Sequence, residues 1–394
     1  MNLPSNPFRV RDPTLFGLIV LGIANHMVLT GNRVTVTLEA IKQGHSTAVV
    51  GTLVALFAFL PMLCAVAAGR VSDRIGARKP MLAGSLGLAA GALIPVLVPG
   101  LFALFASAAL VGVSFMAFQV ASQNATGELG GATGRVHNFS QLALGYSISG
   151  LLGPLIAGFT IDHAGFATSF AVLAVIPLIP AAVLAAGALA LPGPHPVHAD
   201  SSSVAAPGGM FELFAHRKLR RVFIINVLLA MGWDLHTIVI PVYGAGIGLS
   251  ASQIGVILAS FAAATFVVRF SMRWIVRLAT PHQVLTIALF IAGTVYMLFP
   301  FVHTATALMA MSFTLGLGLG MSQPMVMSLL HSHAPPGRTG EAGGLRMSLV
   351  QSMACAVPLA FGALGATVGL TPVFWSVGVC LATGGWLTKR GNGA

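Results

Sequence analysis

The sequence GRVSDRIGARKP, residues 69–80, places five charged side chains between two long apolar segments. Charge is scarce elsewhere, because only 7% of all residues are Asp, Glu, Lys or Arg, whereas 56% are hydrophobic. Soluble domains carry about a quarter charged residues. A soluble fold with a mean hydropathy of +0.90 would expose larger apolar patches than water tolerates. The composition therefore predicts an integral membrane protein and excludes an ordinary soluble one.

The segments on both sides of this loop belong to a series of apolar runs. A run of about 20 residues crosses the ~30 Å hydrocarbon core of a bilayer as a helix. The sequence predicts twelve such spans, so the expected fold class is an all-α polytopic membrane protein. The spans are expected at residues 14–36, 47–68, 80–99, 101–124, 140–161, 168–191, 222–244, 252–272, 282–301, 304–330, 345–368 and 371–388.

A polar segment separates the first six spans from the last six. Its first half is rich in Pro, Ser, Gly and Ala, which is typical of a flexible linker. Its second half, residues 210–221, has the pattern of a short interfacial helix. The predicted organisation is a six-helix bundle at residues 1–191, a cytoplasmic linker at 192–221 and a second six-helix bundle at 222–394.

The basic residues favour one side of the membrane. With the amino terminus in the cytoplasm, Lys and Arg fall in cytoplasmic segments or helix ends, except Lys42 in an outer loop and Arg33 inside the first span. The positive-inside rule then predicts a multi-pass protein of the cell inner membrane with both termini cytoplasmic. This distribution accounts for the net charge of +11, so the bilayer is expected as a partner and nucleic acid is not.

The chain repeats itself at a shift of 204 residues. Glycines, serines, glutamines, prolines and phenylalanines match at this constant offset in three separate blocks. The repeat predicts two pseudo-symmetric six-helix bundles related by an axis along the membrane normal. The matched pairs are Gly44 with Gly248, Ser46 with Ser250, Gly51 with Gly255, Gly112 with Gly316, Gln119 with Gln323, Pro154 with Pro358, Gly158 with Gly362, Gly165 with Gly369 and Phe170 with Phe374.

The charged loop resembles the loop signature of the major facilitator superfamily: Gly, three residues, Asp-Arg, one residue, Gly, then a basic pair. The resemblance implies a twelve-helix transporter in which this loop acts as a conformational latch that steadies the outward-open state. In the second half Arg273 and Arg277 replace the first glycine and the aspartate, so the latch is expected to be asymmetric. The latch residues are Gly69, Asp73, Arg74, Gly76, Arg78 and Lys79.

The fifth span, GYSISGLLGPLIAG, resembles the glycine-proline pattern of the superfamily's drug and metabolite:proton antiporters. Such a helix packs tightly and kinks easily, and the resemblance implies export. Two positions depart from the pattern. Ala157 stands where a glycine is usual, and Ala108 stands where the fourth span of such exporters carries a buried Arg. The predicted helix-packing motif is Gly145, Gly150, Gly153, Pro154 and Gly158.

Ionisable side chains within the spans are candidates for proton coupling, because each costs at least ~2.5 kcal/mol to insert. Asp234 is the best candidate, since a carboxyl in a low-dielectric cavity can change protonation as the cavity opens to either side. Alternatively, it forms a static ion pair with Arg33 or a histidine. His26 and His236 can relay protons near neutral pH, or serve as neutral hydrogen-bonding groups between helices.

Other polar side chains are candidates for binding substrate. Spacings of seven residues place Asn25 over Asn32 and His26 over Arg33 on one face of the first span. Glutamines within the spans can orient a substrate or join helices. Arg269 and Arg346, near the inner ends of their spans, can bind a substrate anion or anchor in lipid headgroups. This positive balance favours an anionic or zwitterionic substrate. The candidates are Asn25, Asn32, Arg33, Gln119, Gln123, Trp233, Gln323, Arg269 and Arg346.

The sequence indicates no catalytic, metal or cofactor site. There is no phosphate-binding pattern for ATP, and His331 and His333 are weak metal candidates. The predicted function is therefore a monomeric secondary transporter that moves a small organic solute by alternating access, driven by protons, with export as the favoured direction. Proton-coupled uptake of an anionic or zwitterionic metabolite is the alternative. A membrane enzyme or receptor without transport is the alternative from a different class.

Overall fold

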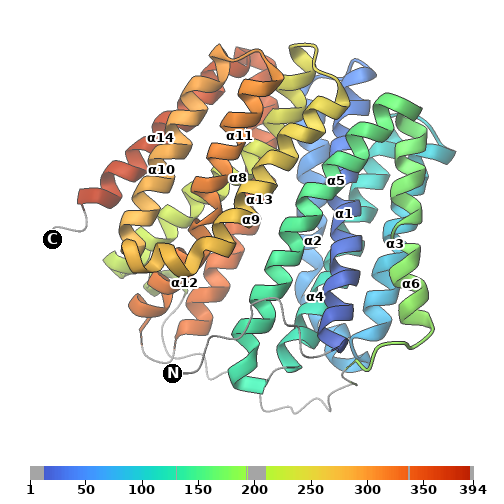
Figure 1. Ribbon diagram of the computed structural model, residues 1–394, viewed down its shortest axis with the longest axis horizontal. Helices are drawn as coiled ribbons and strands as arrows, with labels where there is room; N and C mark the ends of the chain where they lie inside the picture. Colours follow the sequence, from blue (N-terminus) through green and yellow to red (C-terminus); the bar gives the residue numbers. More distant parts are fainter. Residues whose placement is uncertain (1–12, 130, 192, 194–209, 336–337, 391–394) are drawn as a thin grey trace. The chain divides into compact units, whose positions relative to one another are not determined.

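The computed structural model describes residues 13–390, except 130, 192, 194–209 and 336–337. The described part of the chain contains helices and no strand, which confirms the all-α prediction. The helices of the first half (Figure 1) are α1 (Pro13–Lys42), α2 (Thr47–Ile75), α3 (Arg78–Leu97), α4 (Leu101–Glu128), α5 (Gly131–Val175) and α6 (Leu178–Ala185). Those of the second half are α7 (Met210–Ala215), α8 (Arg217–Gly246), α9 (Ala251–Leu278), α10 (Pro281–Leu298), η1 (Phe299–Phe301), α11 (Ala305–Gly320), α12 (Ser322–His333), α13 (Thr339–Val368) and α14 (Leu370–Arg390).

The helical segments account for twelve membrane crossings. Within the described residues, 11 segments are long and apolar enough to span a bilayer. One of them, His137–Ala185, has 49 residues. At 1.5 Å per residue it is more than twice as long as the ~30 Å core requires. It therefore holds the fifth and the sixth crossing, and the predicted number of twelve is confirmed.

Glycines in the left-handed backbone region end helices at matching points of the two halves. Gly165 breaks α5 internally with φ 82° and ψ 174°, and Gly369 separates α13 from α14 with φ 81° and ψ 175°. Gly44 and Gly248, with φ 79° and 82°, end α1 and α8 in the same way. Both pairs are 204 residues apart in the chain. The backbone thus reproduces the repeat that the sequence predicts, at positions where a side chain would be strained.

Two predicted spans differ from the observed helices, and the second of these differences has a local cause. The sixth span, expected at 168–191, consists of the end of α5 and the short α6, which stops at Ala185. The tenth, expected at 304–330, is interrupted at Met321 between α11 and α12. Pro324 follows this break, and a proline ring clashes with the carbonyl four residues earlier. The interfacial helix expected at 210–221 is divided into α7 and the first turn of α8.

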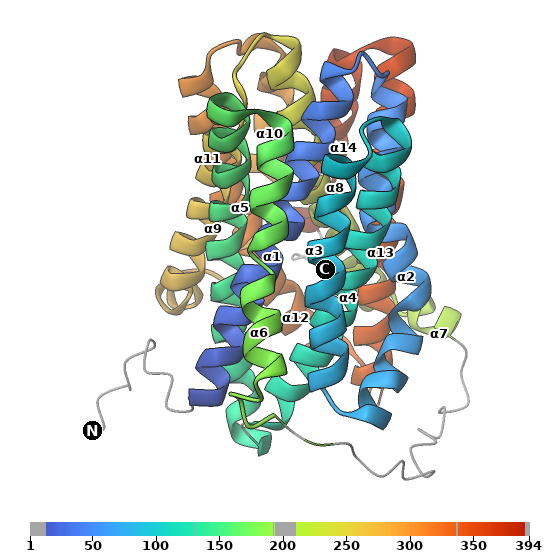
Figure 2. The same cartoon turned by 90° about the vertical axis from the view of Figure 1, so that its right-hand side faces the viewer.

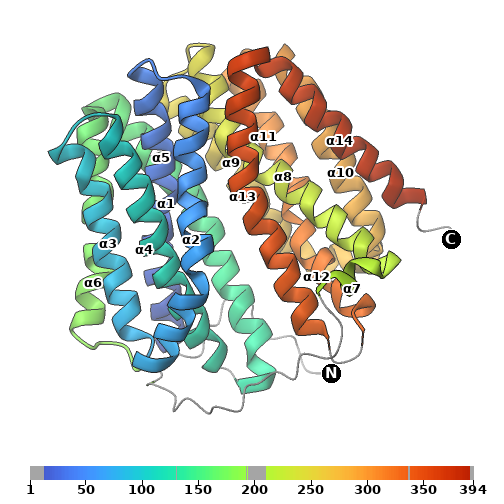
Figure 3. The same cartoon turned by 180° about the vertical axis from the view of Figure 1, so that it is seen from behind.

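The chain divides into two compact units. The first comprises residues 1–36 and 60–197, and the second comprises 37–59 and 198–394. In the first unit α3 and α4 lie side by side (Figure 2). In the second, α10 pairs with α14, as Figure 3 shows, and α9 pairs with α11.

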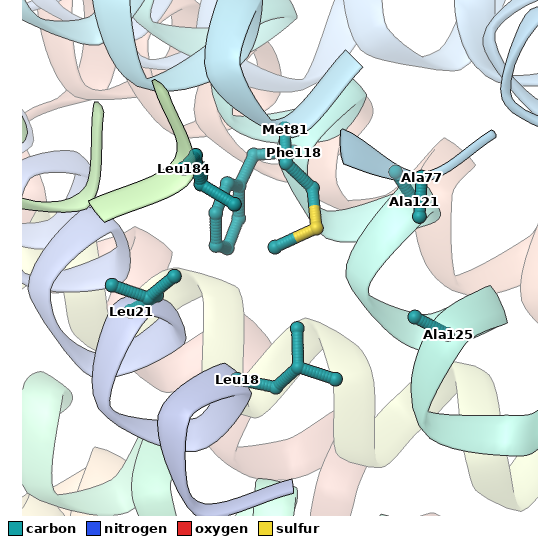
Figure 4. Close-up of a cluster of buried hydrophobic side chains, with 8 residues drawn as sticks. All are labelled: Leu18, Leu21, Ala77, Met81, Phe118, Ala121, Ala125 and Leu184. Carbon is teal, nitrogen blue, oxygen red and sulfur yellow. The ribbon is translucent and has the colours of Figure 1, made fainter. Parts of the chain in front are cut away.

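One apolar cluster of the first unit joins four helices. Its members come from α1, the start of α3, α4 and α6 (Figure 4). Phe118 and Met81 are fully buried there, and burial of such a side chain contributes about 1.5–3 kcal/mol. The cluster consists of Leu18, Leu21, Ala77, Met81, Phe118, Ala121, Ala125 and Leu184.

Residues 47–59 of α2 pack against α13 within the second unit. Thr47 Oγ1 donates a hydrogen bond of 3.2 Å to the Gly362 carbonyl. A Cβ at Gly362 would come within 2.7 Å of the Thr47 carbonyl and 3.0 Å of the Gly51 Cα. The two backbones therefore approach closely, as small residues permit in membranes.

Candidate functional site

The charged segment 69–80 was predicted as a loop, but residues 69–75 form the end of α2, residues 78–80 begin α3, and only two residues lie between the helices. Side-chain hydrogen bonds tie this segment to the rest of the first unit. Asp73, which is exposed, accepts a 3.3 Å hydrogen bond from Asn124 Nδ2 on α4. Arg78 Nη2 donates a 2.8 Å hydrogen bond to the Leu189 carbonyl, just beyond the carboxyl end of α6. Gly76 makes the turn with φ 79°. Arg74 and Lys79 are exposed, and Gly69 lies near Val120 of α4.

The glycines of the fifth span allow α5 to lie close against α1. A Cβ at Gly153 would collide with Thr30 Oγ1 and lie 2.6 Å from the Met27 carbonyl oxygen and 3.0 Å from the Gly31 nitrogen. About two turns earlier, a Cβ at Gly145 would lie 2.9 Å from the Ile19 side chain. Pro154 follows Gly153 inside α5. The predicted motif residues 145 and 153 thus lie at a tight helix crossing.

Asn25 and Asn32 join α1 to its neighbours. Asn25 Nδ2 donates to Ser85 Oγ of α3 at 2.9 Å, and Asn32 Nδ2 donates to Ser107 Oγ of α4 at 3.1 Å. Both asparagines are completely buried. These hydrogen bonds stabilise helix packing, and a role in substrate binding stays a prediction.

His26 is the centre of a polar and aromatic group in the first unit. Its Nδ1 lies 2.6 Å from Ser149 Oγ of α5, and its ring lies 4.9 Å from that of Tyr146 and 5.2 Å from that of Phe115. Gln119 of α4 lies near the Tyr146 hydroxyl, which is buried without a well-formed hydrogen bond among the described residues. Two predicted residues, His26 and Gln119, are thus connected through Tyr146.

His236 is the centre of a corresponding group in the second unit. Its Nε2 lies 3.0 Å from Ser312 Oγ of α11, and its ring stacks on Phe261 of α9 at 4.3 Å. Trp233 contacts the same Phe261 edge-on at 4.8 Å. His236 is only 1% exposed, and its Nδ1 is buried without a hydrogen-bond partner in the described part of the chain.

Asp234 lies deep within α8 beside this group. It is half-buried, and its backbone carbonyl accepts a 2.8 Å hydrogen bond from Thr237. Tyr296 of α10 donates its hydroxyl hydrogen to the carbonyl of Gly232, two residues before Asp234, and is within electrostatic range of Asp234. The distance along α8 from its start to Asp234 is about 25 Å at 1.5 Å per residue. The carboxyl is therefore far from both ends of the span.

Arg346 on α13 contacts α8 nearer its start. It is 9% exposed, and its Nη1 donates to Asn226 Oδ1 at 3.4 Å. Arg269, partly buried on α9, Arg33, partly buried on α1, and the exposed Gln123 and Gln323 lie on other helices. Within each unit, the structure thus brings some of the predicted residues together in local groups.

Several residues of these groups were missed by the sequence analysis. Ser149, Tyr146 and Ser312 each interrupt an apolar run, which is the signal that identifies a buried polar group. Phe261 carries no such signal, because an aromatic residue in an apolar span is ordinary. Asn226 is likewise polar within an apolar run, but it pairs with a residue 120 positions away.

These features define a multi-pass membrane protein made of repeated helical halves with polar groups inside the spans. A family profile described as "Major Facilitator Superfamily" matches residues 16–358. The chain belongs to the major facilitator superfamily, a family of transporters, and it is accordingly a transport protein. A sequence comparison with curated proteins finds no significant match.

Solved structures of transporters share this fold. A peptide transporter POT in complex with sulfate has a TM-score of 0.79 at 16% identity, with 98% of this chain and 96% of that chain covered. A POT family transporter in complex with a thioalcohol conjugated peptide has a TM-score of 0.77 at 16% identity, with 95% and 94% covered. Another, in complex with 5-aminolevulinic acid, has a TM-score of 0.76 at 15% identity, with 95% and 94% covered. At these identities the likeness is one of fold.

Proposed function

We propose that this transporter is a proton-driven secondary transporter that exports a small organic solute across the cell inner membrane. The observation that carries the proposal is the position of Asp234, a half-buried carboxyl far from both ends of α8. A carboxyl at such depth costs at least ~2.5 kcal/mol by insertion scales. A functional use explains why the chain retains it.

The chemistry follows from the surroundings of Asp234. When its side of the protein is open to water, the carboxyl can ionise, and when it is closed off the neutral acid is favoured by desolvation. His236, two residues further along α8, lies 3.0 Å from Ser312 of α11 through its Nε2, and an imidazole can pass on a proton. Uptake and release of the proton on opposite sides would bias the two conformations, because a ligand shifts an equilibrium only through differential affinity.

Export is supported by the close α1–α5 crossing at Gly153, in the motif that resembles proton-driven exporters. A second candidate is proton-coupled uptake of an anionic or zwitterionic metabolite. It is favoured by the buried Arg346, whose hydrogen bonds in the described residues go to neutral groups. Structures of similar fold hold a conjugated peptide or 5-aminolevulinic acid, which are small solutes of this kind.

The remaining expectations form part of the same proposal. We place both termini in the cytoplasm, divide the chain at the 192–221 linker and expect a monomer. The loop residues around Asp73 are proposed to act as the conformational latch, with the Asn124 hydrogen bond as the contact that holds Asp73 in this state. Asp73→Ala should then change the rate of exchange between conformations more than the affinity for solute.

Reconstitution in proteoliposomes tests the proposal. A screen of metabolites and drugs for thermal stabilisation of the purified protein selects the solute. Accumulation when the lumen is acidic identifies exchange of solute for protons, whereas accumulation when the outside is acidic identifies symport. Asp234→Asn should abolish accumulation in either case, and Asp162→Asn, at an exposed position near the kink of α5, should preserve it. Normal accumulation by Asp234→Asn, or none by the unaltered protein in either gradient, refutes the proposal.

A further inference from the structure

Arg346 is a buried cation whose hydrogen-bond partners are neutral. Nη1 donates to Asn226 Oδ1 at 3.4 Å, and Nη2 lies 3.1 Å from the Met347 thioether sulfur, a weak acceptor. Nε is buried and has no partner among the described residues. A buried guanidinium that lacks an acid carries a desolvation penalty that no ion pair offsets. The edge formed by Nε and Nη2 is therefore poorly satisfied.

Asn226 adds a second unsatisfied donor next to this edge. It is 5% exposed, and its Nδ2 is buried without a partner in the described part of the chain. The contact between Oδ1 and Arg346 fixes the orientation of the amide, because the flipped amide would point a donor at a guanidinium. Arg346 Nε and Asn226 Nδ2 both require an acceptor.

The acidic side chain nearest along α13 is already engaged. Glu341 accepts from Arg338 Nε at 2.7 Å and from Arg338 Nη2 at 2.9 Å, so both carboxylate oxygens are used. This pair also shows what the Nε–Nη2 edge of an arginine binds when an acid is present. The same edge of Arg346 holds only a sulfur. A carboxylate would complete it with two parallel hydrogen bonds.

We propose that Arg346 and Asn226 form a seat for a single oxyanion, filled by the carboxylate of the transported solute. This inference rests on the proposed transport function and names the chemical class of its substrate. The carboxylate binds the Nε–Nη2 edge of Arg346 and accepts from Asn226 Nδ2, and it replaces the thioether contact. Binding removes an uncompensated charge, so it favours the conformation in which the seat is formed.

A lipid phosphate offers the same chemistry as a solute carboxylate, but the position favours the solute. Along their helices, Asn226 is about 13 Å from the start of α8 and Arg346 about 10 Å from the start of α13, at 1.5 Å per residue. The basic run at the start of α8, residues 217–221, is the part suited to headgroups. The seat lies deeper and is covered by protein.

Thermal unfolding of the purified protein with propionate tests the seat, and propionamide is the neutral control of the same shape. Propionate should raise the melting temperature at constant ionic strength, and propionamide should not. Arg346→Gln should abolish the rise, whereas Arg277→Gln, at an exposed position on α9, should retain it. Equal rises with both compounds, or an undiminished rise in Arg346→Gln, overturn the proposal.

Nanodiscs distinguish the two sources of oxyanion. In phosphatidylcholine discs the propionate response should persist. If phosphatidylglycerol alone raises the melting temperature, and this rise is lost in Arg346→Gln, the lipid occupies the seat and the assignment to solute is wrong.

A second variant tests the seat without any ligand. Asn226→Asp places a carboxylate beside Arg346, so it should raise the melting temperature by several degrees and abolish the response to propionate. Asn25→Asp, a matched change beside Ser85, should lower the melting temperature because it buries an unpaired charge. If Asn226→Asp destabilises the protein as Asn25→Asp does, water or another group already satisfies Arg346 and the proposal fails. Neither measurement uses transport. If propionate binds the seat but the protein shows no proton-driven accumulation of solute, the proposed function is refuted and the seat is not.

Discussion

Gly153→Ala should destabilise the first unit, although alanine is the better helix former. The added Cβ would lie 2.6 Å from the Met27 carbonyl oxygen and would collide with Thr30 Oγ1, whereas ordinary contacts begin at 3.4 Å. Helices α1 and α5 must therefore separate locally by about 0.8 Å. Overpacking of this kind costs about 1–3 kcal/mol, and the gain in helix propensity is at most ~1 kcal/mol. Because the Met27 carbonyl belongs to the backbone and cannot rotate away, the cost should lie in the upper part of this range, at about 2–3 kcal/mol. The expected net loss is then about 1–2 kcal/mol.

Thermal unfolding of the detergent-purified protein measures this loss. With about 2–4 °C per kcal/mol for large domains, the melting temperature should fall by roughly 2–8 °C. Gly344→Ala is the matched control, since among the described residues nothing beyond the adjacent residues and backbone of its own helix lies within 4 Å of an added Cβ there. It should leave stability unchanged or raise it. Thr30→Ala in the Gly153→Ala background should restore only part of the loss, because the Met27 carbonyl remains. A Gly153→Ala protein as stable as the unaltered one would refute this reasoning.

Three further substitutions test hydrogen bonds of the second unit by thermal unfolding. Ser250→Ala removes the capping box of α9, in which Gln253 N bonds Ser250 Oγ, and should cost about 1 kcal/mol; an unchanged melting temperature would show that this helix end is solvated instead. Ser312→Ala leaves the buried His236 Nε2 unsatisfied and should cost about 1–3 kcal/mol, with Ser376→Ala as an expected neutral control. Tyr243→Phe removes the 3.0 Å bond to the Val302 carbonyl and should cost about 1 kcal/mol, and a gain in stability would contradict this.

The number of crossings could be predicted because hydropathy alone determines which segments can cross a bilayer. The points at which the helices break and turn were harder to predict from the sequence. Apolar residues continue across Gly165, so hydropathy gives no sign of the turn there, and the clearest signal was its match with Gly369 in the repeat. The break at Met321 had a signal in Pro324, three residues later, that a hydropathy count ignores.

The candidate site was predictable only one residue at a time. Depth in a span identified Asp234, His236 and Arg346 as unusual, because ionisable groups are costly in hydrocarbon. Which groups meet depends on how the helices are rotated and packed. Asn226 and Arg346 are 120 residues apart, and nothing in the local sequence of either predicts the other.

The membership of residues 37–59 in the second compact unit bears on how the polypeptide can be divided into fragments. A cut within the linker would leave Thr47 and Gly51 on one fragment and Gly362 on the other. A carboxy-terminal fragment produced alone would expose the glycine face of α13 that α2 covers. When the two fragments are co-expressed, their assembly would then depend on residues 37–59 of the amino-terminal fragment packing into the carboxy-terminal one. A separately added peptide of residues 37–59 would compete for the same place on α13.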